Sequence, residues 1–418
     1  MKILIVSANG FSKILNNGKT LESMFHYFAP SELCQLITRP QLQIDTEFCS
    51  SIYSVTEIDI IKRFLCKSKN CGGEFNISDI KDQIHIYDKK SKYNTKIPQI
   101  LRDLIWRTNI WKTKKLKNWI KKENPDLIFL VGGGYKYFHS LGEFVAKLQN
   151  IPIALFYADD YLIYPLKNGI LGKLSKYRME RHYKKIISKS IIRFAIGEMM
   201  CKNYSEYFGM KFYPIMNSVP IKKYTDNNLT QDILTLSYFG GLHLNRWKMI
   251  ARIAKLLPLN IRILVYTASD ISKEIKNRFD QANVRIMGCV TGEELDKAIE
   301  NSNILLHVES DEKNYRALTR LSVSTKIPEY LMAGRPIIGF GPQEVASMHV
   351  LSDNKVGISV DSELSDEQIK DILEIKLNDI PYLKALGKKA YNFAVNNFDG
   401  DKISQDFRKK LEETIYLK

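Results

Sequence analysis

Two series of short apolar runs, separated by amphipathic segments, constrain the fold of this chain more than any other feature. Runs that are apolar along their whole length are typical of strands in a parallel sheet with helices on both faces. The first half has helical patterns such as 18–28 and 135–149 between its runs. Its predicted strands are 2–8, 51–56, 126–132, 151–158, 191–197 and 212–217.

A second series of the same kind begins after an irregular stretch. Residues 214–232 contain two prolines and little apolar periodicity, which predicts a linker. Two series of similar length predict an α/β protein with two doubly wound Rossmann-like domains that face one another across a cleft. The later strands are predicted at 234–240, 261–267, 284–288, 304–309, 336–340 and 356–360, and the helices at 246–257, 274–281, 292–301 and 328–333.

The length of 418 residues agrees with two domains of roughly 200 residues each. We place the N-terminal domain at 1–215 and the C-terminal domain at 216–394. Residues 395–418 are predicted to form a helix that packs back on the first domain. The polar, irregular segment 67–98 is predicted to be an insertion.

Composition excludes several classes of protein. A hydrophobic fraction of 44% excludes a disordered chain, and six scattered cysteines do not form a disulfide framework. The apolar run at 3–6 is shorter than the core of about 7 to 15 residues in a signal peptide. No segment approaches the ~20 apolar residues that span a bilayer. These features predict a cytoplasmic protein, free or peripheral on the inner face of the membrane.

The net charge of +16 predicts an anionic partner. The charge is concentrated at 96–125 and 167–193, each with nine basic residues against two acidic residues and one, respectively. In the first stretch Leu116, Trp119 and Ile120 share one helix face, and lysines occupy the other. This pattern predicts docking on an anionic membrane surface. The alternative is a core-facing stripe with a solvated basic back.

The most specific motif spans residues 324–342, where a polar loop opens a short helix before a buried strand. Pro328 suits the first turn of that helix, and Gly334 suits the position after its end. Free N–H groups at the helix start, together with Thr325 and Lys326, could hold a phosphate or a sugar. Glu329 could accept hydrogen bonds from a ribose diol. The alternative is a capped helix with a dipole-favoured Glu329.

This motif, together with residues 236–241, 284–288 and 304–310, resembles the C-terminal domain of GT-B glycosyltransferases, close to family 4. The first half is similar more loosely, through 1–7, 125–129 and 196–204. The resemblance implies a hexosyltransferase-like, retaining enzyme of bacterial surface polysaccharide biosynthesis. Its co-substrate would be a nucleotide-diphosphate sugar and its acceptor a glycan or a lipid-linked glycan, with no cofactor and no metal.

The resemblance also implies roles for particular residues. Glu329 matches the second Glu of a motif in which two Glu residues flank seven others, and that Glu binds the ribose. The first Glu would fall at Leu321, so recognition of the donor sugar must differ; Glu309, Ser310 and Glu312 are candidate substitutes.

Further donor residues follow from the same resemblance. Arg246 and Lys248 occupy the region where relatives neutralise the diphosphate, although a solvent-facing charge at a helix start is the alternative for Arg246. Gly241 stands where relatives have a basic residue after the strand. Cys289 and Val290 stand where relatives hold the base through backbone groups.

The first domain supplies three more candidates. Gly18 would let a donor phosphate approach the backbone, although Lys13 excludes a P-loop because that motif requires glycine there. Asp159 and Asp160 follow a strand at the carboxyl edge of the sheet. Either could orient the acceptor hydroxyl or accept its proton, and the alternative is that one caps the turn. The pair Cys66 and Cys71 lacks the further ligands of a zinc site.

Two other functions stay open at this point. A GT-B epimerase or phosphorylase would share the fold, because fold does not fix function. A nucleic-acid-binding protein would explain the charge, but the sequence lacks the aromatic and helix-turn-helix patterns of such proteins. We therefore expect no nucleic-acid partner. The basic helices favour the transferase.

Overall fold

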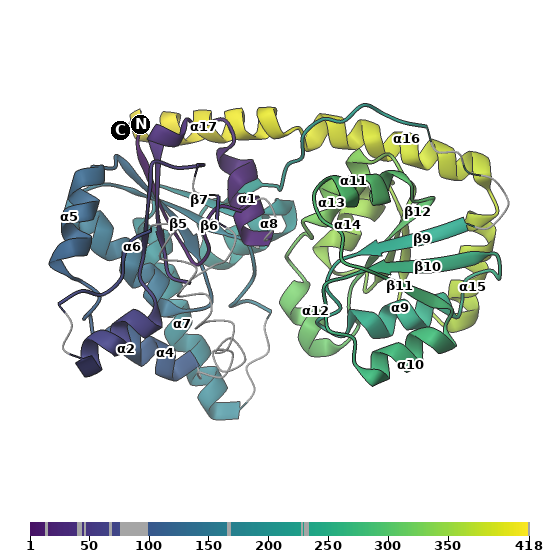
Figure 1. The fold of residues 1–418 in the computed structure, drawn as a ribbon, viewed down its shortest axis with the longest axis horizontal. Helices are drawn as coiled ribbons and strands as arrows, with labels where there is room; N and C mark the ends of the chain where they lie inside the picture. Colours follow the sequence, from purple (N-terminus) through teal and green to yellow (C-terminus); the bar gives the residue numbers. More distant parts are fainter. Residues whose placement is uncertain are drawn as a thin grey trace. The chain divides into compact units, whose positions relative to one another are not determined.

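The computed structural model describes residues 1–12, 16–39, 44–45, 47–66, 69–75, 99–164, 169–226, 229 and 234–416. The chain divides into two compact units (Figure 1). Unit 1 comprises the described residues of 1–162, 167–215 and 401–418, and unit 2 comprises those of 163–166 and 216–400. The unit boundary near the C-terminus therefore falls after Gly400, a few residues beyond the predicted position at 394.

The strands described in unit 1 form one sheet in the order β4-β3-β2-β1-β5-β6-β7-β8. Every pairing is parallel except that of β3 with β4. The strands are β1 (Ile3–Ser7), β2 (Leu33–Ile37), β3 (Ser51–Ser54), β4 (Gly73–Glu74), β5 (Leu127–Gly132), β6 (Ile153–Tyr157), β7 (Ile192–Ile196) and β8 (Tyr213–Ile215).

Helices of unit 1 connect these strands, as the alternation in the sequence predicts. They are α1 (Asn16–Phe25), the short 3-10 helix η1 (Pro30–Glu32), α2 (Glu57–Cys66), α4 (Gln99–Arg107), α5 (Lys114–Glu123), α6 (Lys136–Gln149), α7 (Gly169–Lys189) and α8 (Gly197–Phe208).

The C-terminal helix α17 (Gly400–Tyr416) also belongs to unit 1. Its Phe407 ring lies 5.2 Å from the ring of Phe25 and 5.5 Å from that of Phe129. The Arg408 guanidinium donates to both carboxylate oxygens of Glu32, at 2.7 and 2.8 Å. An aromatic core and a bidentate ion pair thus hold the end of the chain on the first sheet.

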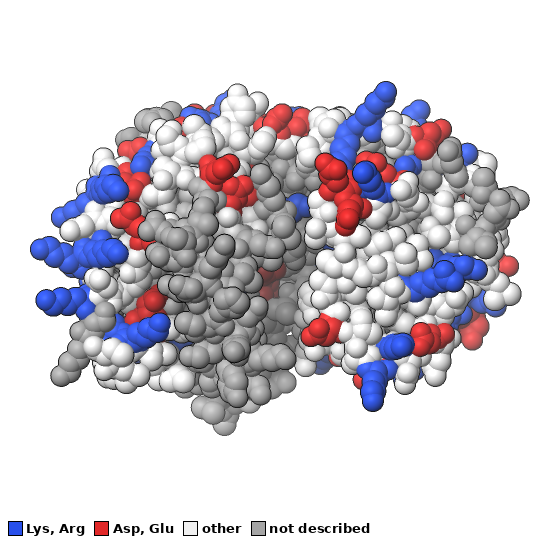
Figure 2. All heavy atoms as spheres, in the orientation of Figure 1, with Lys and Arg blue, Asp and Glu red and all other residues white. Residues whose placement is uncertain are grey.

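Helix α5 buries its apolar stripe. Leu116 and Ile120 have no exposed surface, and the Trp119 ring packs 5.2 Å from that of Tyr53 while its indole N–H donates to Ser51. The lysines of the opposite face are exposed, and Figure 2 shows basic side chains along the edge of unit 1 where α5 lies. The stripe therefore belongs to the core, and only the charge of α5 is available to a membrane.

Unit 2 contains a sheet in the order β11-β10-β9-β12-β13-β14, in which all pairs are parallel. Its strands are β9 (Leu234–Phe239), β10 (Ile261–Tyr266), β11 (Val284–Gly288), β12 (Ile304–Val308), β13 (Ile337–Gly341) and β14 (Ile358–Asp361). Its helices are α9 (Arg246–Ala254), α10 (Lys273–Gln281), α11 (Glu293–Glu300), α12 (Lys313–Thr319), α13 (Lys326–Met332), α14 (Ala346–Asp353), α15 (Asp366–Leu377) and α16 (Ile380–Asn397).

Some elements differ from the prediction. Strand β2 was not predicted, because Gln35 interrupts its apolar run, yet Gln35 is fully buried and hydrogen-bonded to Ser7. Within the segment predicted as an insertion, residues 69–75 include β4, and 67–68 and 76–98 lie outside the described residues. Within the predicted linker, the N–H of Val219 donates to the carbonyl of Phe398.

Both sheets reverse their strand order once. In unit 1 the chain builds outward from β1 through β2 and β3, and then from β5 in the opposite direction. In unit 2 the reversal lies between β9 and β12. Ligands of doubly wound sheets bind at the carboxyl ends of the strands at this reversal. The topology therefore predicts ligand sites at the loops after β1, β5, β9 and β12.

Candidate functional site

A buried polar cluster lies at the reversal in unit 2. Three elements contribute to it: the segment from β9 into α9, the end of β12 and the start of α13. The cluster, called here the cationic cluster, consists of Tyr238, Gly240, Arg246, His307, Glu309 and Lys326.

Glu309 joins two neighbours in this cluster. One carboxylate oxygen accepts from Arg246 at 3.1 Å, and the other lies 3.1 Å from Nε2 of His307. Glu309 is only 2% exposed. Burial by itself raises the pKa of the Glu309 carboxyl, but the charge of Arg246 and the hydrogen bond to His307 hold that pKa at about 2. Glu309 is therefore ionised and fixes the Arg246 side chain.

Lys326 is the second cation. Its ammonium lies 4.6 Å from the centre of the Tyr238 ring, and a side chain on Gly240 would place Cβ 2.0 Å from Nζ. Gly240 has φ +144, a backbone conformation that favours glycine. Burial, with repulsion from Arg246, lowers the pKa of Lys326 to about 7 despite the attraction of Glu309 and Glu329.

The cluster is short of negative charge. The guanidinium of Arg246 is 13% exposed, and its Nε has no hydrogen-bond partner among the described residues. One buried carboxylate, Glu309, faces both Arg246 and Lys326. A buried hydrogen-bond donor without a partner lies beside a second cation whose pKa is lowered. This arrangement favours the binding of an anionic ligand.

The predicted donor residues occupy different places relative to this cluster. Glu329 lies on α13, half-buried and close enough to Lys326 to raise the pKa of that ammonium. Thr325 precedes α13 but makes no side-chain cap, and Ser324 accepts the N–H of Ile327 through its carbonyl and of Lys326 through its hydroxyl. Two of the N–H groups at the start of α13 thus donate to the preceding loop of the same chain.

Lys248 is not brought into the cluster. Its ammonium is paired with Glu312 at 2.8 Å, and the side chain is 49% exposed. The amide of Asn245 donates to the same carboxylate oxygen of Glu312. Two of the candidate substitutes for the missing first Glu carry a carboxylate. Of these, Glu309 neutralises Arg246 and Glu312 neutralises Lys248.

The remaining donor candidates lie near the same sheet edge. The carbonyl of Gly241 accepts from the Tyr238 hydroxyl at 2.7 Å, and a Cβ there would lie 2.4 Å from the His243 ring. Cys289 and Val290 follow β11, two strands away from β9, and Cys289 is exposed. Leu321, in the position of the missing Glu, is 1% exposed and packs in the core.

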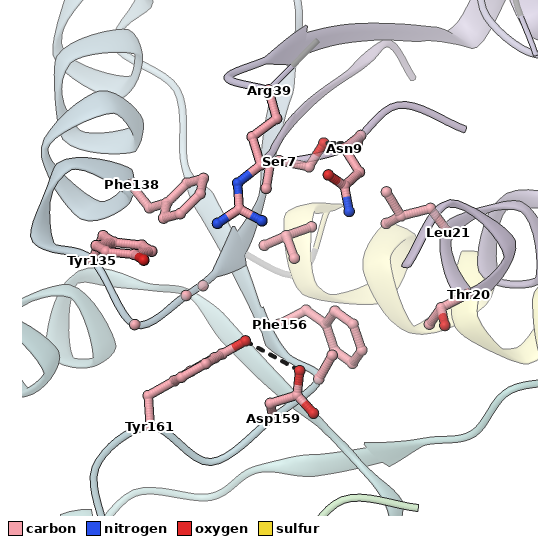
Figure 3. Close-up of a pocket in the computed structure, with 16 residues that line it drawn as sticks. Ser7, Asn9, Thr20, Leu21, Arg39, Tyr135, Phe138, Phe156, Asp159 and Tyr161 are labelled. Carbon is pink, nitrogen blue, oxygen red and sulfur yellow. Dashed lines mark hydrogen bonds between the residues drawn. The ribbon is translucent and has the colours of Figure 1, made fainter. Parts of the chain in front are cut away.

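A pocket of about 210 Å³ lies at the reversal in unit 1 (Figure 3). The end of β1 and the loop after it line the pocket through Ser7, Ala8 and Asn9, and the end of β5 and the loop after it through Gly132–Gly134. Other lining residues are Thr20, Leu21, Arg39, Val131, Tyr135, Phe138, Phe156, Ala158, Asp159 and Tyr161.

The two aspartates of unit 1 have different environments. Asp159 lines the pocket and accepts from the Tyr161 hydroxyl at 3.1 Å. Asp160 has no exposed surface, and one of its oxygens accepts from the Leu162 N–H and from the Tyr204 hydroxyl, each at 2.9 Å. Asp160 therefore has the turn-capping position that sequence analysis left open for one of the pair.

Gly18 lies in the first turn of α1, where its own loop is close. A Cβ at Gly18 would lie 2.6 Å from Cβ of Ser12 and 2.7 Å from the carbonyl oxygen of Gly10. The glycine therefore permits close packing of the loop after β1, and residues 13–15 of that loop lie outside the described residues.

Sequence analysis missed several residues of both sites. In unit 1 these are Arg39, the three glycines and Gln35, whose side chain bonds to Ser7, Asn9 and Phe11 and so fixes the loop after β1. Gly132 ends a predicted strand and Gly133 and Gly134 directly follow it, and this signal could have identified the pocket. In unit 2, sequence analysis named Gly241 but not its neighbour Gly240.

Comparison with known proteins shows the fold. HepE of Anabaena, solved in complex with UDP, superposes with a TM-score of 0.64 at 12% identity, over 99% of this chain and 100% of that chain. Sucrose-phosphate synthase of Thermosynechococcus elongatus gives 0.65 at 12% identity, over 100% of both chains. This chain has the GT-B fold. The predicted fold class and the resemblance to GT-B glycosyltransferases are confirmed.

WaaG, a glycosyltransferase involved in lipopolysaccharide biosynthesis, has the same GT-B fold, with a TM-score of 0.56 at 11% identity over 97% of this chain and 99% of that chain. No family model and no curated protein matches the sequence. None of the described helices is long and apolar enough to cross a membrane. The described His, Cys, Asp and Glu side chains form no group of three that could hold a metal ion.

Proposed function

We propose that this GT-B protein is a glycosyltransferase that moves a sugar from a nucleotide-diphosphate sugar to a glycan or a lipid-linked acceptor, with retention at the anomeric carbon. Unit 2 binds the donor and unit 1 binds the acceptor. The new glycosidic bond forms from the acceptor hydroxyl as the bond to the diphosphate breaks, and the nucleoside diphosphate leaves with the electron pair.

The cationic cluster is the observation that carries this proposal. Arg246 and Lys326 converge at the strand-order reversal, and Glu309 offsets only one of their charges. A diphosphate supplies the missing negative charge and accepts from the unpaired Nε of Arg246. Glu329, on the same helix as Lys326, accepts from the ribose hydroxyls. The structures of HepE with UDP and with UDP-glucose support this choice of donor.

Asp159 serves the acceptor in this proposal. It lines the pocket of unit 1, whereas Asp160 is fully buried. The Asp159 carboxylate orients the attacking hydroxyl and accepts its proton. An epimerase would instead place acid and base carboxylates around one sugar nucleotide, and the described cationic cluster holds a single buried carboxylate, Glu309, which is already committed to Arg246.

We propose a bacterial surface polysaccharide as the pathway of the product and the cytoplasmic face of the membrane as the location. The resemblance to family 4 and the likeness to WaaG support the pathway. The exposed lysines of α5 support the location, because each basic residue near an anionic leaflet contributes about 1 kcal/mol.

Calorimetric titration of UDP, GDP, dTDP and CMP into the protein tests the donor site. At least one nucleoside diphosphate should bind, and Glu329→Gln should weaken its binding because an amide accepts less strongly from the ribose diol than a carboxylate does. Glu374→Gln, on α15 outside the cluster, is the matched control and should bind like the unaltered protein. Equal affinities for Glu329→Gln and the control would remove Glu329 from the site, and the absence of binding by every nucleotide would refute the function.

A further inference from the structure

The pocket of unit 1 has two chemically different ends. Figure 3 shows the Arg39 guanidinium on one side of the pocket, and Asp159 with its partner Tyr161 on the other. The N–H of Arg39 donates to the carbonyl of Ala8, which anchors its backbone beside the loop after β1. A ligand in this pocket would therefore meet a cation at one end and a carboxylate at the other.

The Arg39 guanidinium has no ion-pair or hydrogen-bond partner among the described residues. The other arginine next to the pocket is engaged: Arg102 pairs with Glu57 at 3.1 Å and stacks over the Tyr135 ring. A guanidinium presents a planar fork of donors that matches a carboxylate or a phosphate. The pocket thus contains an oxyanion partner that the protein itself does not use.

The walls of the pocket limit the size and shape of the ligand. Sites for drug-sized ligands measure roughly 300–1,000 Å³, so a pocket of about 210 Å³ suits a single ring. Tyr135, Phe138, Phe156 and Tyr161 supply apolar and aromatic surface, and the three glycines offer backbone without side chains. A Cβ on Gly132 would lie 2.1 Å from the Tyr157 ring, so the open backbone is a fixed feature.

We propose that this pocket selects an acceptor sugar that carries an oxyanion, either a carboxylate or a phosphate. Arg39 binds the oxyanion, and Asp159 receives the hydroxyl that is to be glycosylated. The opposite positions of the two side chains keep the anionic group away from the Asp159 carboxylate. This inference rests on the proposed function for the role of Asp159, but the binding preference itself stands on the pocket alone.

The test is a ligand-observed NMR titration with glucose, galactose, glucuronate, galacturonate, glucose 1-phosphate and glucose 6-phosphate. At least one charged sugar should bind roughly tenfold or more tightly than its neutral parent, because a charge-assisted pair is stronger than a neutral hydrogen bond. Arg39→Gln should abolish that preference. A preference for the uronates identifies a carboxylate acceptor, and a preference for the phosphates identifies a sugar phosphate.

Two variants make the result specific. Lys147→Gln removes one positive charge from an exposed position on α6 outside the pocket and should leave the preference unchanged. Arg39→Lys keeps the charge without the fork and should retain only part of the preference. Thermal unfolding of each variant tests whether its fold is intact.

The outcomes separate this inference from the proposed function. If no charged sugar binds better than its neutral parent, or if Arg39→Gln keeps the preference, the inference is overturned even where a nucleotide binds in unit 2. If an Arg39-dependent preference is found while every nucleotide fails to bind, the pocket assignment stands and the transferase function falls.

Discussion

At the scale of single residues, two basic side chains that are close in sequence can have very different surroundings. Arg246 and Lys248 are two residues apart on α9, yet Arg246 is half-buried against Glu309 and Lys248 is exposed and paired with Glu312. A charge in a dry setting interacts more strongly than one in water. Of these two residues, we therefore expect only Arg246 to contribute strongly to the binding of a diphosphate.

Arg246→Gln should weaken the binding of a nucleoside diphosphate by about 1.5–3 kcal/mol, the usual contribution of a charge-assisted hydrogen bond, and should change nucleoside binding much less. Lys248→Gln is the matched control on the same helix and should weaken diphosphate binding much less, because exposed ion pairs contribute little. Calorimetry with the diphosphate and the nucleoside measures both. Equal losses for the two ligands in Arg246→Gln would place Arg246 away from the phosphates.

In the proposed donor site, Lys326 should make nucleotide binding dependent on pH. Burial lowers its pKa to about 7 in the free protein, so the ammonium loses its proton as pH rises above that value. A diphosphate stabilises the protonated form and raises the pKa again. Between roughly pH 7.5 and 9, affinity should therefore fall with increasing pH, and binding should take up a proton.

Calorimetry at pH 8 in two buffers of different ionisation enthalpy measures this proton uptake. Lys326→Arg, which stays charged throughout this range, should bind with little pH dependence. If the variant and the unaltered protein show the same slope of affinity against pH, Lys326 is not the group that titrates.

At the scale of elements, α5 shows how an amphipathic pattern has two interpretations. The hydrophobic face of α5 buries Trp119, whose indole donates to Ser51 at 3.0 Å. A face that is packed in the core cannot also insert into a bilayer. The basic face is free for electrostatic contact with anionic lipid, which salt screens.

Sedimentation with anionic liposomes should carry the protein down at low salt and release it at about 1 M salt, where the Debye length is about 3 Å. Changing Lys114, Lys115, Lys117 and Lys121 to Gln should reduce this binding, because these four side chains are exposed. The emission of Trp119 should not change on binding. Protein that stays in the supernatant at low salt would exclude the membrane surface as a partner.

At the scale of the whole molecule, the end of the chain stabilises the unit that contains its beginning. Phe407 of α17 packs between Phe25, Phe129 and Phe194, and Ser404 accepts from the N–H of Tyr27 and donates to the carbonyl of Met24. The cationic cluster lies entirely in unit 2. Loss of α17 packing should therefore affect the two units differently.

Phe407→Ala should destabilise unit 1 by about 3–5 kcal/mol, the usual cost of removing a buried aromatic ring. A nucleotide at 100 times its dissociation constant should stabilise unit 2 by about 2.7 kcal/mol. Differential scanning calorimetry with and without nucleotide measures both effects. If Phe407→Ala abolished nucleotide binding while the protein stayed folded, the independence of the cationic cluster from α17 would be disproved.

The sequence by itself determined the α/β class and most strands of both sheets, and it predicted Arg246, Lys326 and Glu329 as donor-binding residues. The class and the strands depend on local periodicity, which a linear sequence contains, whereas the predicted roles of Arg246 and Glu329 come from the resemblance to GT-B glycosyltransferases. Only the tertiary structure decided that Glu309 fixes Arg246, that Gly240 makes room for Lys326, and that Arg39 shares a pocket with Asp159. These neighbours lie after different strands or at the starts of different helices, and the order of strands in a parallel sheet is set by the packing of the crossover helices rather than by local pattern.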